Sequence, residues 1–177
     1  MAAPLRIAHT HVHSLRLGSG AEALVARVLA ADGTPGFGFA LELDAAAARD
    51  MAAWDALARA RQAPLAELLG GRRREEVPLC ADAGAAALVD PFASGAIEQA
   101  CAAAASASAL ALLAPHAHPW EITFCAALAA ALPAPEVRIL ARGSCSPARV
   151  AVPRGPGIGI DWSLEAGFAA LRWVEPA

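Results

Sequence analysis

The segment PHAHPWE, residues 115–121, concentrates the side chains of this sequence that are best suited to chemistry. It follows an apolar stretch, residues 110–114, that is typical of a buried strand. His116 thus lies just beyond the C-terminal end of a predicted strand, and a histidine titrates near neutral pH, which suits proton transfer. Asp90 follows a second short apolar stretch in the same way. Two interpretations stay open: a proton-transfer site around His116, or a histidine that only packs or hydrogen-bonds.

A second group of histidines stands at alternate positions near the N-terminus: His9, His11 and His13. Alternate residues of a strand share one face, so three imidazoles could line it and bind Zn²⁺ or Ni²⁺. Side chains two apart on a strand are separated by roughly 6.5–7 Å, so all three can hardly meet one ion without help from another chain.

Composition excludes several classes of function. The 177 residues include 50 Ala, no Lys, no Asn and no Tyr, and the net charge is −3. No basic face stands out, which argues against a nucleic-acid partner. Residues 100–114 form a long apolar run, but its Ala and Ser content predicts a soluble helix and a buried strand rather than a membrane span. No signal peptide is apparent, and four cysteines without C-x-x-C spacing predict free thiols in a reducing cytoplasm.

The elements that must position these residues fall into two groups. Alternating apolar residues and the turn at Asp32-Gly33 predict an antiparallel meander of strands at 5–17, 22–31 and 37–43. A helix capped by Asp44 follows, with an apolar stripe of Met51, Trp54, Leu57 and Ala58, in which Trp54 is expected to anchor the core. Pro64 and the pair Gly70-Gly71 then bound a second, short helix.

After a basic run at residues 72–74, which predicts a solvated linker, the rhythm becomes β-α-β-α-β. This rhythm predicts parallel strands with crossover helices. The expected elements are strands at 77–80, 87–89, 110–114 and 136–141, helices at 95–107 and 120–132, a turn-rich return at 153–159, and a last short helix at 163–173.

Three stretches resemble the mandelate racemase/muconate lactonizing enzyme branch of the enolase superfamily. LRIAHTHVHSLRL with ALVARVLAADGTPGFGFA is similar to the opening meander of the family's capping domain. DMAAWDALARARQAPLAELLGG is similar to that domain's helix signature. VDPFASGAIEQACAAAASASALALLAPHAHPWEITFCAALAAALP resembles the sixth and seventh barrel units, and GPGIGIDW resembles the C-terminal return.

The resemblance implies an α+β capping domain joined to a (β/α)-barrel with a Mg²⁺ site. There, a base removes the proton alpha to a carboxylate, and the metal stabilises the enediolate that forms. His116 matches the family's seventh-strand base. The sixth-strand Asp that pairs with this base falls on Phe92, with Asp90 the only nearby carboxylate, and Glu136 falls near the eighth-strand carboxylate. We therefore take His116, Asp90 and Glu136 as candidate catalytic residues, and His118 and Trp120 as candidate substrate-binding residues.

The chain departs from the family in length and in key residues. Members are about twice as long, in keeping with a cap and a barrel of at least about 200 residues. The strands that carry the metal carboxylates are missing between residues 80 and 85, and without Lys the paired-lysine base cannot exist. The metal ligands are therefore unassigned.

The expected organisation is a shortened cap at 1–74, an incomplete barrel at 75–152 and a return at 153–177 that packs on the cap. The expected function is that of a degenerate structural or interaction protein in the cytoplasm. The alternative is a Mg²⁺-dependent acid-sugar dehydratase or racemase with His116 as base. Because a partial barrel has open edges, the expected partners are a second copy or a full-length relative, and a small carboxylate is a possible ligand.

Overall fold

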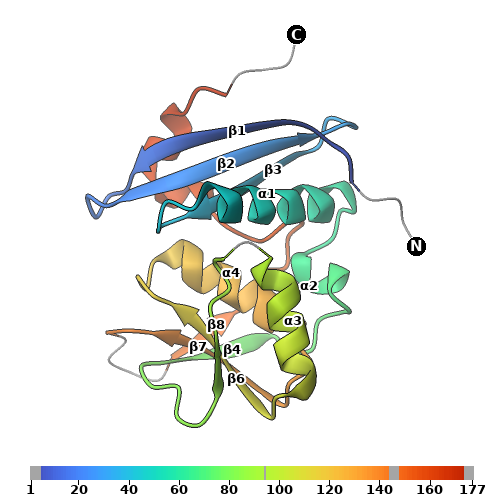
Figure 1. The fold of residues 1–177 in the computed structure, drawn as a ribbon, viewed down its shortest axis with the longest axis vertical. Coiled ribbons are helices and arrows are strands. Elements are labelled where there is room, and N and C mark those ends of the chain that lie inside the picture. Colours follow the sequence, from blue (N-terminus) through green and yellow to red (C-terminus); the bar gives the residue numbers. More distant parts are fainter. Residues whose placement is uncertain (1–4, 94, 144–147, 174–177) are drawn as a thin grey trace.

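The computed structural model describes residues 5–93, 95–143 and 148–173, which form two stacked layers (Figure 1). The upper layer is an antiparallel sheet, ordered β1-β2-β3, with one helix on a face. The lower layer is a five-stranded sheet, ordered β5-β6-β7-β4-β8, with two helices against one face. The elements of the upper layer are β1 (Ile7–Arg16), β2 (Glu22–Ala30), β3 (Pro35–Ala40) and α1 (Ala45–Ala60).

The meander follows the predicted pattern with two corrections. A register shift between Ile7 and His9 turns Ile7 to the face that packs on α1, although the strict alternation of a strand would place it on the face of His9. The third strand ends at Ala40 rather than at residue 43, since the chain turns there and Leu43 has a φ of 60°.

Helix α1 begins as predicted, because the Asp44 carboxylate accepts hydrogen bonds from the N–H groups of Ala46 and Ala47 at 2.8 and 3.2 Å. Of the predicted stripe, Met51 and Ala58 are buried, whereas Leu57 and Trp54 are not. Trp54 is only half-buried. The residues of α1 that pack on the sheet are small: Ala48, Ala52 and Ala56.

Two glycines explain this close packing. A Cβ at Gly36 would collide with the backbone of Ala52 and Ala56, and one at Gly38 would collide with the backbone of Ala48 and Ala52. The sequence Gly-Phe-Gly in β3 thus lets α1 lie directly on the sheet, which leaves no room for a large anchor.

The lower sheet has the predicted β-α-β order. Strands β5, β6, β7 and β4 are parallel, and β8 pairs antiparallel with β4 at the opposite edge from β5. Together with the upper layer, this confirms an α+β cap joined to an incomplete barrel. The elements are α2 (Leu65–Leu68), β4 (Glu76–Cys80), β5 (Ala87–Val89), α3 (Ala96–Ser106), β6 (Ala109–Ala114), α4 (Pro119–Ala129), β7 (Glu136–Ala141) and β8 (Ala148–Ala151).

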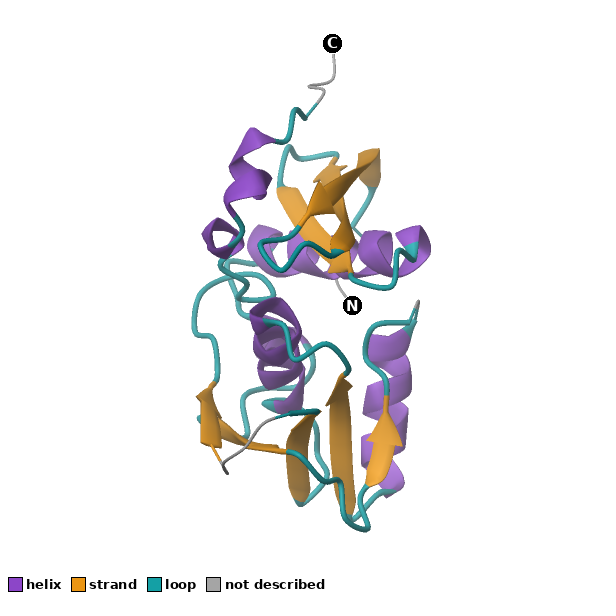
Figure 2. Cartoon of the chain, turned by 90° about the vertical axis from the view of Figure 1, so that its left-hand side faces the viewer, coloured by secondary structure: helices purple, strands orange, loops and turns teal. Residues whose placement is uncertain are grey.

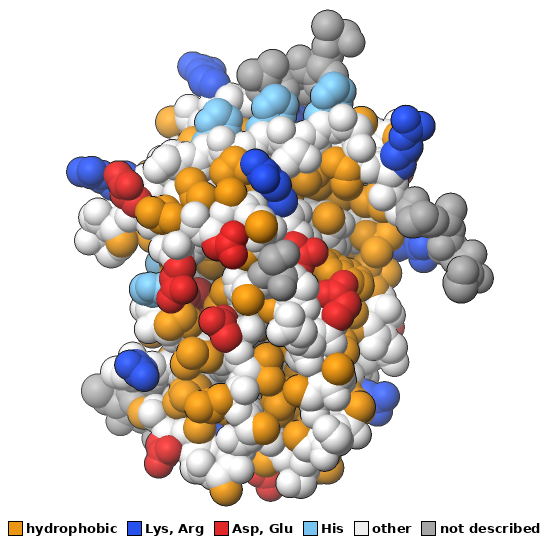
Figure 3. All heavy atoms as spheres, in the orientation of Figure 1, with side chains coloured by type: hydrophobic (Ala, Val, Ile, Leu, Met, Phe, Trp, Pro, Cys, Tyr) orange, Lys and Arg blue, Asp and Glu red, His pale blue; other side chains and the backbone are white. Residues whose placement is uncertain are grey.

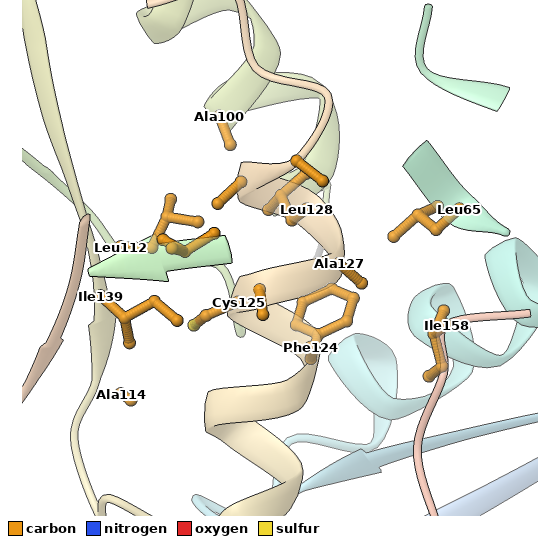
Figure 4. Packing of buried hydrophobic residues seen from close by; sticks show 14 of the residues in the cluster. Leu65, Ala100, Leu112, Ala114, Phe124, Cys125, Ala127, Leu128, Ile139 and Ile158 are labelled. Atoms are coloured by element: carbon orange, nitrogen blue, oxygen red, sulfur yellow. The ribbon is translucent and has the colours of Figure 1, made fainter. Parts of the chain in front are cut away.

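Helix α4 is buried on nearly every side and forms the centre of the core. Phe124 and Cys125 lie between the strands that carry Leu112 and Ile139 and the part of the core formed by Leu65 and Ile158 (Figure 4). Burial raises the pKa of the Cys125 thiol well above its ordinary value, and the charge of Glu121 adds to the effect.

The three arginines at residues 72–74 do not form the solvated linker that their charge predicts. Arg74 donates to the carbonyl oxygens of Ala129, Leu132 and Ala134, and Arg73 donates to that of Ala131 at 3.1 Å. These carbonyls lie at the C-terminal end of α4, where cationic side chains are favoured.

The C-terminal segment returns to the upper layer and covers the second face of its sheet (Figure 2). It forms two 3-10 helices, η1 (Trp162–Leu164) and η2 (Ala166–Ala170), instead of the single helix predicted at 163–173. Trp162 and Phe168 stack at 5.0 Å and lie against Phe37 of β3.

Candidate functional site

The candidate site lies where β5 and β6 end, beneath the loop that joins β3 to α1. A cavity of about 110 Å³ opens there, between cap and barrel remnant. Acidic side chains gather in this band between the two layers (Figure 3). The residues that line the cavity include Glu42 and Asp44 from the cap and Asp90, Phe92 and Glu121 from the lower layer.

His116 is held by a buried carboxylate. Its Nδ1 lies 2.8 Å from Oε1 of Glu121, and its backbone N–H donates to Oε2 at 3.0 Å. Glu121 is 1% exposed. Because a carboxylate only accepts, Nδ1 of His116 carries a proton, and in the neutral imidazole Nε2 is then the acceptor. The His116 side chain is half exposed, so this pair has the geometry of an oriented general base.

His118 is bound at both ring nitrogens. It caps α4 by accepting the N–H of Trp120 on Nδ1 at 3.2 Å, so Nε2 carries the proton and donates to Glu165 at 3.0 Å. Glu165 also accepts the N–H of Gly18 at 2.8 Å. Burial opposes ionisation of Glu165, but the hydrogen bonds from His118 and Gly18 outweigh it and lower its pKa. His118 therefore joins α4 to the cap and the C-terminal segment, with no ring nitrogen left for a substrate.

Trp120, predicted to bind substrate, is fully buried in the core. Its indole N–H donates to the carbonyl of Asp161 at 3.1 Å, and its ring packs against Phe39 and Trp162 at 5.5 and 4.9 Å. Its surroundings fit a core anchor rather than a contact with ligand.

Asp90 lies in the cavity wall but is not the partner of His116. Its Oδ1 accepts the N–H of Phe92 at 2.9 Å, which closes the turn after β5. Asp90 was predicted because it is the carboxylate nearest to Phe92, the position that matches the family's sixth-strand Asp. In the structure, Glu121 contacts the imidazole of His116 instead.

Glu136 lies at the wrong end of the sheet. It opens β7 beside Ala109, the first residue of β6, while His116 follows the last residue of that strand. Five steps of about 3.3 Å place the two ends about 16 Å apart. Glu136 instead pairs with Arg138 at 2.8 Å, and it cannot act on a group bound near His116.

The carboxylates near the ends of the strands do not fit a magnesium site. Within residues 5–93, 95–143 and 148–173, no three His, Cys, Asp or Glu side chains stand close enough to hold one ion. Asp82 and Asp90 each use an oxygen to accept the N–H two residues on. Octahedral Mg²⁺ requires oxygen ligands at about 2.0–2.1 Å, and the described residues do not converge in that way.

The three alternating histidines, His9, His11 and His13, belong to β1. Histidine side chains line the outer rim of the upper layer (Figure 3). His13 lies edge-on to Trp173 at 4.8 Å. His11 stands opposite Arg27, whose positive charge opposes a bound cation. Among the described residues, these histidines also do not form a group of three that could hold a metal ion.

Sequence reasoning missed two important carboxylates. Glu121 stands three residues after His118, the spacing of a capping box, and its side chain indeed accepts the N–H of the N-cap residue at 3.3 Å. Asp55 stands four residues before Arg59 on the buried face of α1, which marks a buried ion pair.

The fold and this site define a class of structure: a capping domain, made of a β-meander and a helix, joined to part of a parallel (β/α) barrel. The chain's N-terminal part matches a known sequence family at residues 19–70: mandelate racemase/muconate lactonizing enzyme, N-terminal domain. The resemblance that the sequence predicts is therefore confirmed for the capping domain. No curated protein matches the chain.

Several solved structures are similar to the chain over part or most of its length. A racemase from Streptomyces coelicolor A3(2) with bound magnesium matches with 10% identity and a TM-score of 0.58, covering 93% of this chain and 100% of that one. Muconate cycloisomerase from Pseudomonas fluorescens matches with 18% identity and a TM-score of 0.37, covering 76% of this chain and 50% of that one. Muconate lactonizing enzyme from Pseudomonas putida gives 20% identity, a TM-score of 0.35 and coverage of 76% and 51%. The chain spans about half the length of the first structures it matches.

Proposed function

We propose that this chain is a degenerate relative of the mandelate racemase/muconate lactonizing enzymes that acts as a structural or interaction protein. The observation that carries the proposal is the way the outer edge of β4 is covered. Strand β4 leads to β5 through six residues, and β8 forms four antiparallel pairs with the outer edge of β4. That edge is where the next strand of a barrel would pair, so the sheet is stabilised without the strands that carry metal ligands in the family.

The chemistry of the remaining carboxylates supports the same proposal. Asp82 and Asp90 hold their own turns, Glu121 holds His116 and the start of α4, and Glu136 lies at the far end of the sheet. Each of these groups has a structural partner, whereas a magnesium-dependent proton abstraction needs several carboxylates aimed at one point.

A second candidate function is favoured by the His116–Glu121 pair. An imidazole with a carboxylate on Nδ1 and a half-exposed ring is suited to remove a proton, and it stands at the strand end where barrel enzymes carry out chemistry. This supports the alternative of an acid-sugar dehydratase or racemase, an isomerase or lyase that binds a small carboxylate and uses Mg²⁺. The described residues supply no ligand set for that ion.

The partners and cellular location belong to the proposal as well. We infer a second copy of the chain or a full-length relative as partner, and the cytoplasm as location because of its free cysteines. Within the described residues, no helix has the length and apolar character needed to cross a bilayer.

Calorimetric titration of chelator-treated protein with Mg²⁺ tests the first proposal. We expect no stoichiometric binding up to millimolar Mg²⁺ and no difference between the wild type and Asp90→Asn or Asp82→Asn. Stoichiometric binding that either substitution abolishes, while Glu98→Gln on the exposed side of α3 retains it, would overturn the proposal.

A separate titration tests the alternative. The ring proton signals of His116, assigned by their loss in His116→Asn, are followed by NMR while mandelate or a sugar acid is added. A saturable shift confined to His116 supports a carboxylate site. Unchanged signals, or equal shifts at the exposed His9, count against it.

A further inference from the structure

Each of the two sheets ends in two edge strands, and three of these four edges are guarded against pairing with another chain. The edge at β1 carries a register shift after Ile7 and ends in Arg16. The edge at β3 begins with Pro35, and the N–H of Phe37 is already bound to Asp55 at 2.9 Å. Strand β8 carries the exposed Arg149 at its centre. Bulges, prolines and charges are the usual devices that protect an edge.

The fourth edge, β5, has none of these devices. It pairs with β6 on one side only. Residues 83–89 read Ala-Gly-Ala-Ala-Ala-Leu-Val, without a charge or a proline. Leu88, at the centre of the strand, is 61% exposed, more than any other large apolar side chain among the described residues. A free, uncharged and apolar edge is a template for another strand.

We propose that β5 pairs antiparallel with β5 of a second copy of this chain, about a two-fold axis near Leu88, so that two partial barrels share one continuous sheet. This deepens the proposed interaction role by naming its partner and surface.

A second copy fits this edge for two reasons. A two-fold antiparallel pairing is self-complementary in its backbone hydrogen bonds. With Leu88 opposite Leu88 of the second copy, Asp90 stands opposite Ala86, so the carboxylates of the two chains do not face each other. The small residues before Leu88 allow the second backbone to approach closely.

The pairing is short, so the dimer is weak. Three residues of strand and their neighbours bury less than the roughly 1,200 Å² of a standard interface. The dimer is therefore expected to form only at high protein concentration, as small transient contacts do. Directly paired side chains lie with Cβ atoms about 4.5–5.5 Å apart, which makes Leu88 the residue most sensitive to substitution.

Light scattering on the whole chain over a range of concentrations tests the proposal. Wild type is expected to pass from monomer to dimer as the concentration rises, and Leu88→Lys is expected to stay monomeric because two ammonium groups would face each other. Leu164→Lys in η1 is the matched control, since Leu164 is 56% exposed and lies on the cap. It is expected to dimerise like wild type.

Cross-linking provides a readout that does not depend on the charged variant. Leu88→Cys is expected to give a disulfide-linked dimer with oxidised glutathione, above the background of wild type and of Leu164→Cys. A wild type that stays monomeric throughout, a dimer that Leu88→Lys leaves intact, or equal cross-linking of both cysteine variants would overturn the β5 pairing. Such a failure is separate from failure of the proposed non-catalytic role, which the Mg²⁺ titration tests.

Discussion

Replacement of Asp55 by alanine is expected to be among the most destabilising single changes in this chain. The Asp55 carboxylate is fully buried and joins three segments far apart in sequence. Oδ2 accepts the N–H of Phe37 in β3 at 2.9 Å and Nε of Arg59 in α1 at 2.6 Å. Oδ1 accepts the N–H of Ile158 in the C-terminal return at 2.8 Å.

The magnitude follows from what the substitution leaves behind. Two backbone N–H groups lose their acceptor, which costs about 1–3 kcal/mol each where water cannot replace it. Arg59 is one-third exposed, so loss of its partner adds less than about 1 kcal/mol. The sum, about 2–7 kcal/mol, is a large part of the 5–15 kcal/mol by which a domain is typically stable.

Urea unfolding followed by circular dichroism measures the change. With a slope of about 2 kcal/mol per molar urea, the midpoint of Asp55→Ala should fall by roughly 2 M. Asp55→Asn keeps one acceptor and should fall by about half as much, while Arg49→Ala on the exposed side of α1 should stay within about 0.5 kcal/mol of wild type. A midpoint for Asp55→Ala within about 0.3 M of wild type would refute the reasoning.

Three further predictions concern packing, pH and thiol reactivity. Gly36→Ala should lower the free energy of unfolding by more than about 2 kcal/mol, because the new Cβ would collide with the backbone of α1. The control Gly155→Ala, which has open space around it, should be nearly neutral. Equal urea midpoints for the two variants would contradict this prediction. Glu165→Gln should cost about 1 kcal/mol at pH 7. The lowered pKa of Glu165 contributes stability that is fully present above the unfolded pKa and is lost as the pH falls through the folded pKa. The stabilities of wild type and variant should therefore converge in acid, and a gap that is constant with pH would count against the prediction. Cys125 should resist a thiol reagent at pH 8 until the chain unfolds, since burial raises its pKa; labelling of native protein that Cys125→Ser removes would show otherwise.

Much of the fold could be predicted from the sequence because local signals agree with tertiary structure. The Asp32-Gly33 turn forms, with Asp32 accepting the N–H of Thr34 at 2.9 Å, and Asp44 caps α1. The parallel order of the lower sheet also follows from its β-α-β rhythm. These features depend on residues close in sequence, whose chemistry is visible without coordinates.

The packing of α1 was harder to predict. An apolar stripe through Trp54 was the natural expectation, since large side chains usually face the core. Gly36 and Gly38, on another element, remove the space that such a side chain would need. The glycines of β3 therefore determine which face of α1 packs on the sheet, and the sequence of the helix alone does not contain that information.

The candidate site shows the same limit. The resemblance located His116 correctly at a strand end but assigned its partner by alignment, whereas the partner is Glu121 in the next helix. The assignment of Glu136 as a catalytic residue does not fit the structure for a different reason. Glu136 is the first residue of β7, so it lies at the end of the parallel sheet opposite to His116. The strand direction alone excludes Glu136 from the site once the strand's first residue is known.

Exchange of the proton alpha to a carboxylate tests the central claim, that this cap and partial barrel lack full catalytic machinery, most directly. The whole chain is incubated in D₂O with a panel of sugar acids and 2-hydroxy acids, with and without Mg²⁺, and exchange is followed by proton NMR. We expect rates equal to buffer for wild type, His116→Asn and Glu121→Gln alike. Exchange above buffer that disappears in His116→Asn but persists in His9→Asn would contradict the account and assign His116 as a working base.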